Sequence, residues 1–202
     1  MKKPENFTKK KKLRHGFKAE AERISLGLRQ EMDLNDYSPL DAFQLAHYMD
    51  VSIFTPAGLG LAQTHIDNLV GSSGWSAFTL INKRDKKIIV HNNLQSIPRQ
   101  QSNIMHELSH ILCKHTNANS TNIYKEYNLP SYMREFDEAQ EAEAIYLGGC
   151  LQIPRECLLW SIGNQNMSKK EISNYYLAST EMVTFRINST GIKYQLKYST
   201  IR

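Results

Sequence analysis

Two histidines and a glutamate in the middle of the chain have the spacing of a metal-binding motif. Within residues 104–115, His106 and His110 stand four residues apart, and Glu107 directly follows the first histidine. On an α-helix, side chains at positions i and i+4 lie on the same face, so both imidazoles can bind one ion. In this H-E-x-x-H pattern the histidines bind zinc and the glutamate acts as a general base. The pattern predicts metal-assisted hydrolysis; a helix with two incidental histidines is the alternative.

The motif lies in a segment whose apolar residues recur at helical spacing, so one side of the predicted helix can be buried. These apolar residues are Ile104, Met105, Leu108, Ile111 and Leu112. Upstream, Ser96 and Pro98 are placed to start the helix, because serine caps helix N-termini and proline suits the first turn. The segment therefore has both a start signal and a side that anchors it in a core.

A third ligand is expected, because a catalytic zinc usually takes three protein ligands and leaves its fourth position for water. A second helix, predicted at residues 135–151, contains acids that can supply it. Glu141 shares its face of this helix with three small residues, Ala144, Gly148 and Gly149. Small side chains let two backbones approach closely, so Glu141 is the favoured third ligand.

Three other residues compete for roles at the site. Glu143 is a rival ligand, although its side of the helix bears large apolar residues that favour the core. Glu138 lies one turn before Glu141 and is a candidate to support the ligands. Cys113 follows His110 by three residues and would complete a closed structural site. One helix rarely supplies three ligands to a tetrahedral ion, so Cys113 is instead expected in the core.

The remaining pattern predicts a mostly helical α+β fold with a small antiparallel sheet. Helices are predicted at residues 17–32, 40–49, 58–70 and 155–162, with one or two more at 168–186. Strands are predicted at residues 51–54, 75–81 and 87–91, with a short edge strand at 192–198. A polar turn at 82–85 joins two strands into a hairpin directly before the histidine helix. Residues 117–130 are polar and are expected to form a loop over the site.

Two further helices have capping signals at their N-termini. Ser38 and Asp41 are candidate N-caps for the helix at 40–49. Ser168 is followed three residues later by Glu171, which is the pattern of a capping box.

Composition and charge exclude several classes of protein. The 202 residues are 41% hydrophobic and 22% charged, with a net charge of +5 that is concentrated in the first 18 residues. This basic start lacks the apolar core of a signal peptide, and no later window is apolar enough for a membrane span. The 3 cysteines are an odd number and are expected to be free thiols in a reducing compartment, which favours the cytoplasm.

Several segments resemble the ImmA/IrrE family of metallopeptidases, and the resemblance covers nearly all of residues 13–202. H-G-F-K-A-E-A-E-R-I at 15–24 and D-Y-S-P-L-D-A-F-Q-L-A at 36–46 resemble the family's leading helices. E-A-E-A-I-Y-L-G-G-C-L-Q-I-P at 141–154 is similar to the family's E-x-x-A-N-x-F-A-A-x-L-L-M-P. Arg99 and His115 also match residues common in the family. The departures are Ile145 for Asn, Leu147 for Phe, Gly148-Gly149 for Ala-Ala and Gln152 for Leu.

The resemblance implies a zincin-like metallopeptidase domain in which Glu141 is the third ligand of Zn²⁺ and Glu107 is the catalytic base. It implies the metallopeptidase domain at 15–160 and a small helix-turn-helix-like segment at 161–202 packed on it. The run of basic residues at 1–14 is expected to form a flexible arm. Tyr124, Tyr127 and His115 are open candidates to stabilise the oxyanion.

The expected activity is zinc-dependent endopeptidase cleavage of a protein substrate. The resemblance implies that this substrate is a helix-turn-helix transcriptional repressor. The predicted hairpin is a candidate surface for pairing with an extended substrate segment. A non-catalytic, zinc-containing module that sequesters a repressor is the alternative, followed by a DNA-binding regulator. Direct nucleic-acid binding and membrane association are not expected, and no motif bears on the oligomeric state.

Overall fold

The computed structural model describes residues 13–60, 64, 75–81, 86–115 and 137–196. These residues form helices along most of their length and one three-stranded sheet. The α+β class predicted from the sequence is confirmed. Among the described helices, none combines the length and apolarity that crossing a bilayer requires.

The element bounds agree with most of the predicted ranges. The α-helices are α1 (Phe17–Glu31), α2 (Ala42–Tyr48), α4 (Ile97–Leu112), α6 (Glu138–Gln152), α7 (Arg155–Leu158), α8 (Lys169–Tyr175), α9 (Thr180–Ser189) and α10 (Ile192–Gln195). The 3₁₀-helix η1 (Ala57–Leu59) follows the first strand, and the π-helix η2 (Leu159–Asn164) follows α7. The strands are β1 (Ser52–Phe54), β2 (Ala77–Ile81) and β3 (Lys87–His91).

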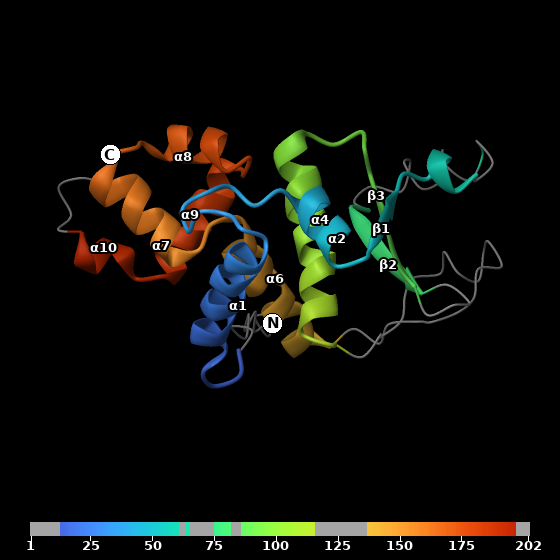
Figure 1. Cartoon of the computed structure of the whole chain (residues 1–202), viewed down its shortest axis with the longest axis horizontal. Coiled ribbons are helices and arrows are strands. Elements are labelled where there is room, and N and C mark those ends of the chain that lie inside the picture. The colour runs from blue at the N-terminus through green and yellow to red at the C-terminus, as the bar shows by residue number, and fades with distance from the viewer. Residues whose placement is uncertain (1–12, 61–63, 65–74, 82–85, 116–136, 197–202) are drawn as a thin grey trace, which may run out of the picture.

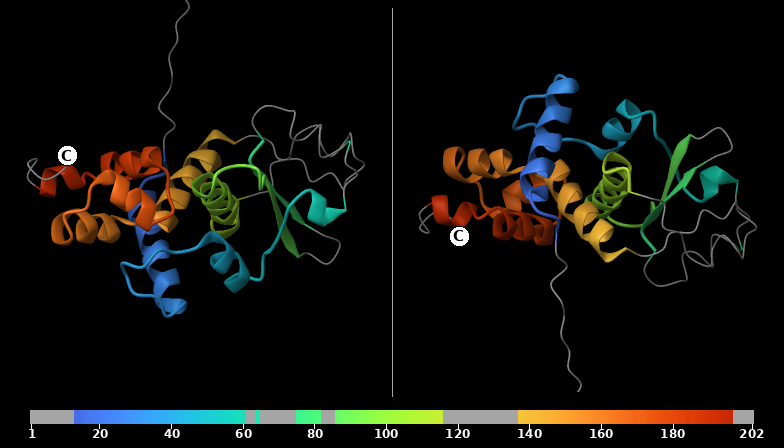
Figure 2. Two further views of the ribbon diagram at one scale, coloured as in Figure 1. Left: turned by 90° about the horizontal axis from the view of Figure 1, so that it is seen from above. Right: turned by 90° about the horizontal axis from the view of Figure 1, so that it is seen from below.

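The elements are arranged along one long axis, as Figure 1 shows. The sheet lies at one end, helices α4, α6 and α1 occupy the middle, and helices α7 to α10 form the opposite end. The views from above and below in Figure 2 show the same order, with α4 between the sheet and α6. Helix α4 packs mainly against α6, and α6 packs in turn against α1.

The sheet is mixed, with β3 at its centre. β2 pairs antiparallel with β3, so the predicted hairpin is confirmed, with Thr79 opposite Ile89. β1 lies on the other side of β3 and runs parallel to it, with Ile53 opposite Ile89. β1 therefore adds a parallel strand to the predicted antiparallel hairpin, because the crossover from β1 returns the chain in the same direction.

The prediction of an edge strand at residues 192–198 is wrong for the part that the structure describes, residues 192–196. Ile192–Gln195 form the short helix α10, which begins after Gly191 in the left-handed conformation (φ of 68°). Ile192 is fully buried, and Leu196 packs against the same apolar cluster. A spacing of four residues places both side chains on one side of a helical turn. A helix can therefore bury Ile192 and Leu196 together, although alternating apolar and polar residues predicted a strand.

Other sequence-based predictions fall on residues outside the described ranges. They include the arm at residues 1–12, the turn at 82–85, the loop at 117–130 and most of the helix at 58–70. Of the capping predictions within the described ranges, Asp41 and the capping box are confirmed, whereas Ser38 caps no helix there. Asp41 accepts hydrogen bonds from the backbone at the start of α2, and Ser168 and Glu171 form a capping box at the start of α8.

Two apolar clusters adjoin at residue 153. The first is built by α1, α2, the sheet, α4 and α6, and the second comprises buried residues between Ile153 and Ile192. All three cysteines are free thiols, as expected. The division into domains at residue 160 stays a prediction.

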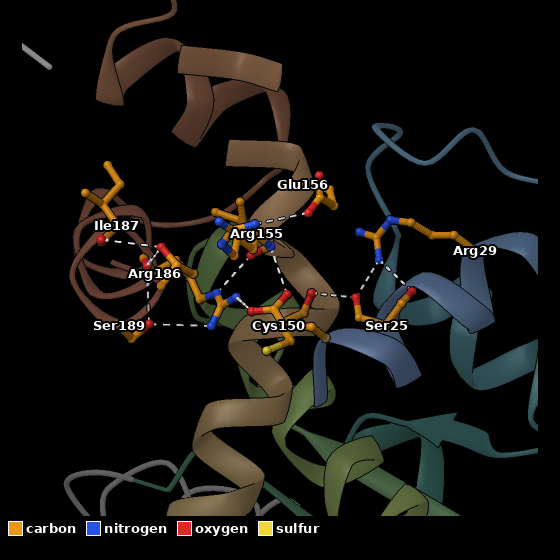
Figure 3. Close-up of polar contacts among 11 residues, drawn as sticks. Ser25, Arg29, Cys150, Arg155, Glu156, Arg186, Ile187 and Ser189 are labelled. Carbon is orange, nitrogen blue, oxygen red and sulfur yellow. Dashed lines mark hydrogen bonds and ion pairs between the residues drawn. The ribbon is translucent and has the colours of Figure 1, made fainter. Parts of the chain in front are cut away.

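Two side chains of α1 hold the C-terminal end of α6, and Figure 3 shows one of them, Ser25, against Cys150. The Ser25 hydroxyl of α1 donates to the Cys150 carbonyl at 2.6 Å, and the fully buried Arg29 donates to the Leu151 carbonyl at 3.0 Å. The last carbonyls of a helix have no partner within it, and cations are favourable at that end of the helix dipole. These contacts therefore stabilise the end of α6 and tie it to α1.

A second buried arginine connects α6 to α9. The Nε of Arg186 donates to the Ile153 carbonyl at 2.8 Å, and one terminal nitrogen donates to the Glu22 carboxylate at 2.5 Å. Arg186 is fully buried, so its charge depends on this pairing. Helices α1, α6 and α9 thus share one buried polar junction where the two apolar clusters meet.

The two adjacent glycines of α6 face different neighbours. A Cβ on Gly148 would lie 3.4 Å from the His106 backbone nitrogen of α4, which is ordinary contact. A Cβ on Gly149 would lie 2.9 Å from the Cδ of Arg186, which is a clash. The expected small face toward α4 is therefore correct for Gly148, whereas Gly149 faces α9.

The two glycines provide a matched test of this packing. We expect Gly149→Ala to lower the free energy of unfolding by about 1–3 kcal/mol, the usual cost of overpacking a core. Gly148→Ala should leave stability unchanged or raise it, because alanine is the better helix former by about 1 kcal/mol. Urea denaturation of both variants measures the difference. Equal stability of the two variants would contradict the assigned contacts.

Candidate metal centre

Three side chains from two helices converge on one point. The Nε2 atoms of His106 and His110 lie 3.1 Å apart on α4. The Glu141 carboxylate of α6 places one oxygen 3.3 Å from the His106 Nε2 and the other oxygen 3.3 Å from the His110 Nε2. Ligands about 2.0–2.1 Å from a tetrahedral zinc ion are themselves separated by about 3.3–3.4 Å. The donor atoms and their spacing therefore fit a zinc ion.

Local structure explains why these side chains meet. The spacing of four residues on α4 aligns His106 and His110 on the side that faces α6. Glu141 stands in the first turn of α6, which Asp137 caps by accepting hydrogen bonds from two backbone N–H groups. The close approach at Gly148, two turns further along α6, brings the two helix backbones together. The ligand set thus depends on one helix capped at its start and close-packed at its middle.

The site is closed on one side and open on the other. The His110 side chain is 4% exposed, whereas those of His106 and Glu141 are 27% and 17% exposed. The exposed side lies where His106 and Glu141 reach the surface. Water and a substrate can therefore approach the ligand atoms from that direction.

The environment of Glu141 keeps it in the charged form that binds metal. Burial raises the pKa of this carboxyl, but hydrogen bonds and charge from His106 and His110 lower it by more. The net result is a pKa well below the ordinary value for glutamate. Metal ligands must be deprotonated, so Glu141 is ready to coordinate a cation at any physiological pH.

Glu107 is held by the sheet and is not part of the ligand cluster. It is 3% exposed, and one of its carboxylate oxygens accepts a hydrogen bond of 2.6 Å from the Thr79 hydroxyl of β2. The hairpin predicted upstream of the helix therefore touches the candidate base directly. Sequence reasoning missed Thr79, because no local signal connects a strand residue to a helix residue 28 positions later.

Glu143, the predicted rival ligand, belongs to a different cluster. Its carboxylate lies 3.3 Å from the His115 Nε2 and 2.9 Å from the Arg14 Nε. The Nδ1 of His115 in turn lies 2.9 Å from the Nδ1 of His110. Glu143 therefore reaches the candidate site only through His115, on the side of His110 that faces away from Glu141.

Cys113 also lies apart from the candidate ligands. It packs against the first apolar cluster, as expected, and its sulfur lies near His115 and Glu143. Burial and the neighbouring Glu143 charge raise the pKa of its thiol to about 11. Cys113 is therefore a neutral thiol at physiological pH.

The other candidates make no described contact with the ligands. Glu138 is exposed at the start of α6, and among the described residues it forms no ion pair with either histidine. Ile145, which stands where the resembling family has Asn, is 44% exposed, so this change leaves the core unaffected. Tyr124 and Tyr127 lie outside the described residues.

Comparisons with known proteins agree with this geometry. The model of the Peptidase_M78 family, described as the IrrE N-terminal-like domain, matches residues 63–188, a range that contains both site helices. No curated protein sequence matches the chain. A solved structure of a Mycobacterium tuberculosis transcriptional regulator shares the fold, with a TM-score of 0.55 and 14% sequence identity.

The structural match covers 88% of this chain and 48% of that protein, so the chain spans about half of its length. At this level of identity the likeness shows the fold alone. The family match is of a different kind, because it covers more than half of the chain and includes His106, Glu107, His110 and Glu141. The chain belongs to the Peptidase_M78 family, the metallopeptidase-type family of IrrE N-terminal-like domains.

Proposed function

We propose that the protein is a zinc-dependent endopeptidase that hydrolyses a peptide bond in a protein substrate. His106, His110 and Glu141 are the proposed zinc ligands, and Glu107 is the proposed catalytic base. The observation that supports this most strongly is the convergence of the three side chains. The two Nε2 atoms lie 3.1 Å apart, and each lies 3.3 Å from one of the two carboxylate oxygens of Glu141. Membership of a metallopeptidase family supports the same reaction type.

The proposed reaction divides between the metal and Glu107. A bound zinc ion supplies Lewis-acid chemistry, because it polarises the scissile carbonyl and acidifies water. The Glu107 carboxylate takes a proton from the attacking water as the new C–O bond forms at the carbonyl carbon. It then delivers that proton to the leaving nitrogen as the C–N bond breaks. The Thr79 hydroxyl holds the plane of the carboxylate in one orientation during both transfers.

The proposed substrate is a helix-turn-helix transcriptional repressor. An extended segment of the repressor's chain would reach the site. Among the described residues the sheet has the strand order β1-β3-β2, so β2 stands at one end of this order. An edge strand can accept an extended peptide through backbone hydrogen bonds. Because Thr79 of β2 contacts Glu107, a peptide paired with this edge would pass beside the base. Such a substrate acts in the cytoplasm, where the free cysteines would stay reduced.

Glu107→Gln tests the proposed base. The variant should bind zinc as the wild type does, because Glu107 is not a proposed ligand. Hydrolysis should fall by about 10²–10⁴-fold, the usual contribution of a general base. Metal analysis of the purified protein and cleavage of a co-expressed helix-turn-helix repressor give the two readouts. A protein that only sequesters the repressor would still relieve repression with this substitution, and a variant that still cleaves would remove Glu107 as the base.

Glu141→Ala tests the third ligand, and Glu138→Ala is the matched control on the same helix. Zinc affinity should fall by more than about 100-fold in Glu141→Ala, since loss of a ligand costs more than the 10–100-fold typical of supporting residues. Glu138→Ala should bind zinc normally, because Glu138 is exposed. Competition with a chelator measures both affinities. Unchanged binding in Glu141→Ala would transfer the ligand role to Glu143 or Cys113.

Thr79→Val tests the link between the sheet and the base. Valine has nearly the same shape but cannot donate to Glu107, and a hydrogen bond to a charged group contributes about 1.5–3 kcal/mol. We expect kcat to fall by about tenfold or more, with zinc affinity unchanged and with recovery in Thr79→Ser. Steady-state kinetics of the three proteins provide the measurement. A Thr79→Val variant with wild-type kcat would show that the hydroxyl does not position the base.

A further inference from the structure

Four polar side chains form a continuous chain behind the candidate metal centre. The exposed Arg14 pairs with Glu143 at 2.9 Å, Glu143 lies 3.3 Å from the His115 Nε2, and the His115 Nδ1 lies 2.9 Å from the His110 Nδ1. The side chains become more enclosed along this path, from 52% exposed at Arg14 to 4% at His110. None of these contacts uses the Nε2 atom that His110 points toward Glu141.

The end of α4 places His115 in this chain. Lys114 adopts the left-handed conformation, with a φ of 52°, and stops the helix. The chain then turns back, so that the His115 backbone N–H donates to the His110 carbonyl at 3.0 Å. Helix α6 supplies Glu143. Glu141 and Glu143 are two residues apart, so their side chains project about 200° from each other around the helix axis. The Glu141 carboxylate therefore lies beside the His110 Nε2, whereas the Glu143 carboxylate is connected to the His110 Nδ1 through His115.

The tautomers of the two histidines follow from this geometry. A metal on the His110 Nε2 leaves the proton of that ring on Nδ1, so the His115 Nδ1 must accept it. His115 must then have its own proton on Nε2, from which it donates to Glu143. Both imidazole hydrogen bonds therefore point toward the Glu143 carboxylate. Arg14, which also pairs with Glu20 at 2.7 Å, lies 2.9 Å from that carboxylate.

We propose that His115 and Glu143 are positioning residues that hold His110 in the orientation and tautomer that bind metal, with Arg14 as the counter-charge. This inference rests on the proposed metal site. A carboxylate behind a metal-binding histidine makes that histidine a better ligand, and here a second imidazole extends the connection. Glu143 thereby acquires a role at the same centre as Glu141 without contacting the metal.

The geometry argues against the alternative, a second metal held by Cys113, His115 and Glu143. Their ligand atoms lie within 4.8 Å of one another. A metal on the His115 Nε2 would, however, move the proton of that ring to Nδ1. That proton would face the proton on the His110 Nδ1 across 2.9 Å, so the first metal excludes the second. Arg14 already provides the positive charge beside Glu143.

Zinc affinity of the full chain tests the proposal through three substitutions. His115→Phe removes both hydrogen bonds and should weaken zinc binding by about 10–100-fold, the usual effect of losing a supporting partner. His115→Gln should recover most of the affinity, because its amide can accept from His110 and donate to Glu143. Cys113→Ser is the matched control in the same cluster and should bind like the wild type. Chelator competition gives the affinities, and the absorption spectrum of the cobalt-substituted proteins reports the ligand geometry.

The outcomes separate this proposal from the proposed function. A wild-type chain that binds no zinc overturns the metal site itself. If the wild type binds zinc, equal affinity in His115→Phe, or equal loss in His115→Phe and His115→Gln, overturns the positioning role alone. Two zinc ions per chain, with one lost in Cys113→Ser, would establish the second metal instead. If His115→Phe melts at a lower temperature than the wild type in the absence of metal, Glu143→Gln takes its place in the test. Glu143→Gln should weaken zinc binding several-fold, and wild-type zinc affinity in this variant overturns the proposal.

Discussion

The candidate site depends on one packing constraint, the close approach of α4 to α6. Gly148 lets the backbone of α6 lie against the backbone of His106, and a side chain larger than alanine there would separate the two helices. Glu141 stands two turns away on the same helix, so any such separation would carry its carboxylate away from both histidines. Because ligand atoms must lie within about 0.2 Å of their ideal distances, the site tolerates little change in this contact.

Helix α6 is fixed at its other end by buried charge in addition to apolar contact. Arg29 and Arg186 are both fully buried, and each donates to carbonyls at the C-terminal end of α6. Burial lowers the pKa of Arg29, which reflects the cost of keeping its charge there. Carbonyl acceptors offset that cost for Arg29, and the Ile153 carbonyl and Glu22 do so for Arg186. Helices α1 and α9 therefore determine where α6 lies. The second apolar cluster therefore contributes to the site through the position of a helix.

The surroundings of the two glutamates of α6 give them different roles. Glu141 faces the open side of the site, where two imidazoles stabilise its charge. Glu143 faces the enclosed side, where Arg14 and His115 are its partners. Glu107 is a third case, because a strand hydroxyl holds it beside the cluster. Three carboxylates of one residue type thus differ in what they touch.

The sequence by itself determined the features that depend on neighbours along the chain. The spacing of His106 and His110, the start signal of the helix and the capping box at Ser168 are all set within one or two turns. The small residues on the face of Glu141 also predicted that its carboxylate lies close to His106 and His110, and its role as a ligand stays a proposal. Tertiary structure decided the rest: Thr79 against Glu107, Arg14 beside Glu143, and a helix where residues 192–195 suggested a strand. The two contacts depend on how distant elements pack against each other, and the helix at 192–195 depends on which side chains the core buries. Neither can be read from the spacing of residues along the chain.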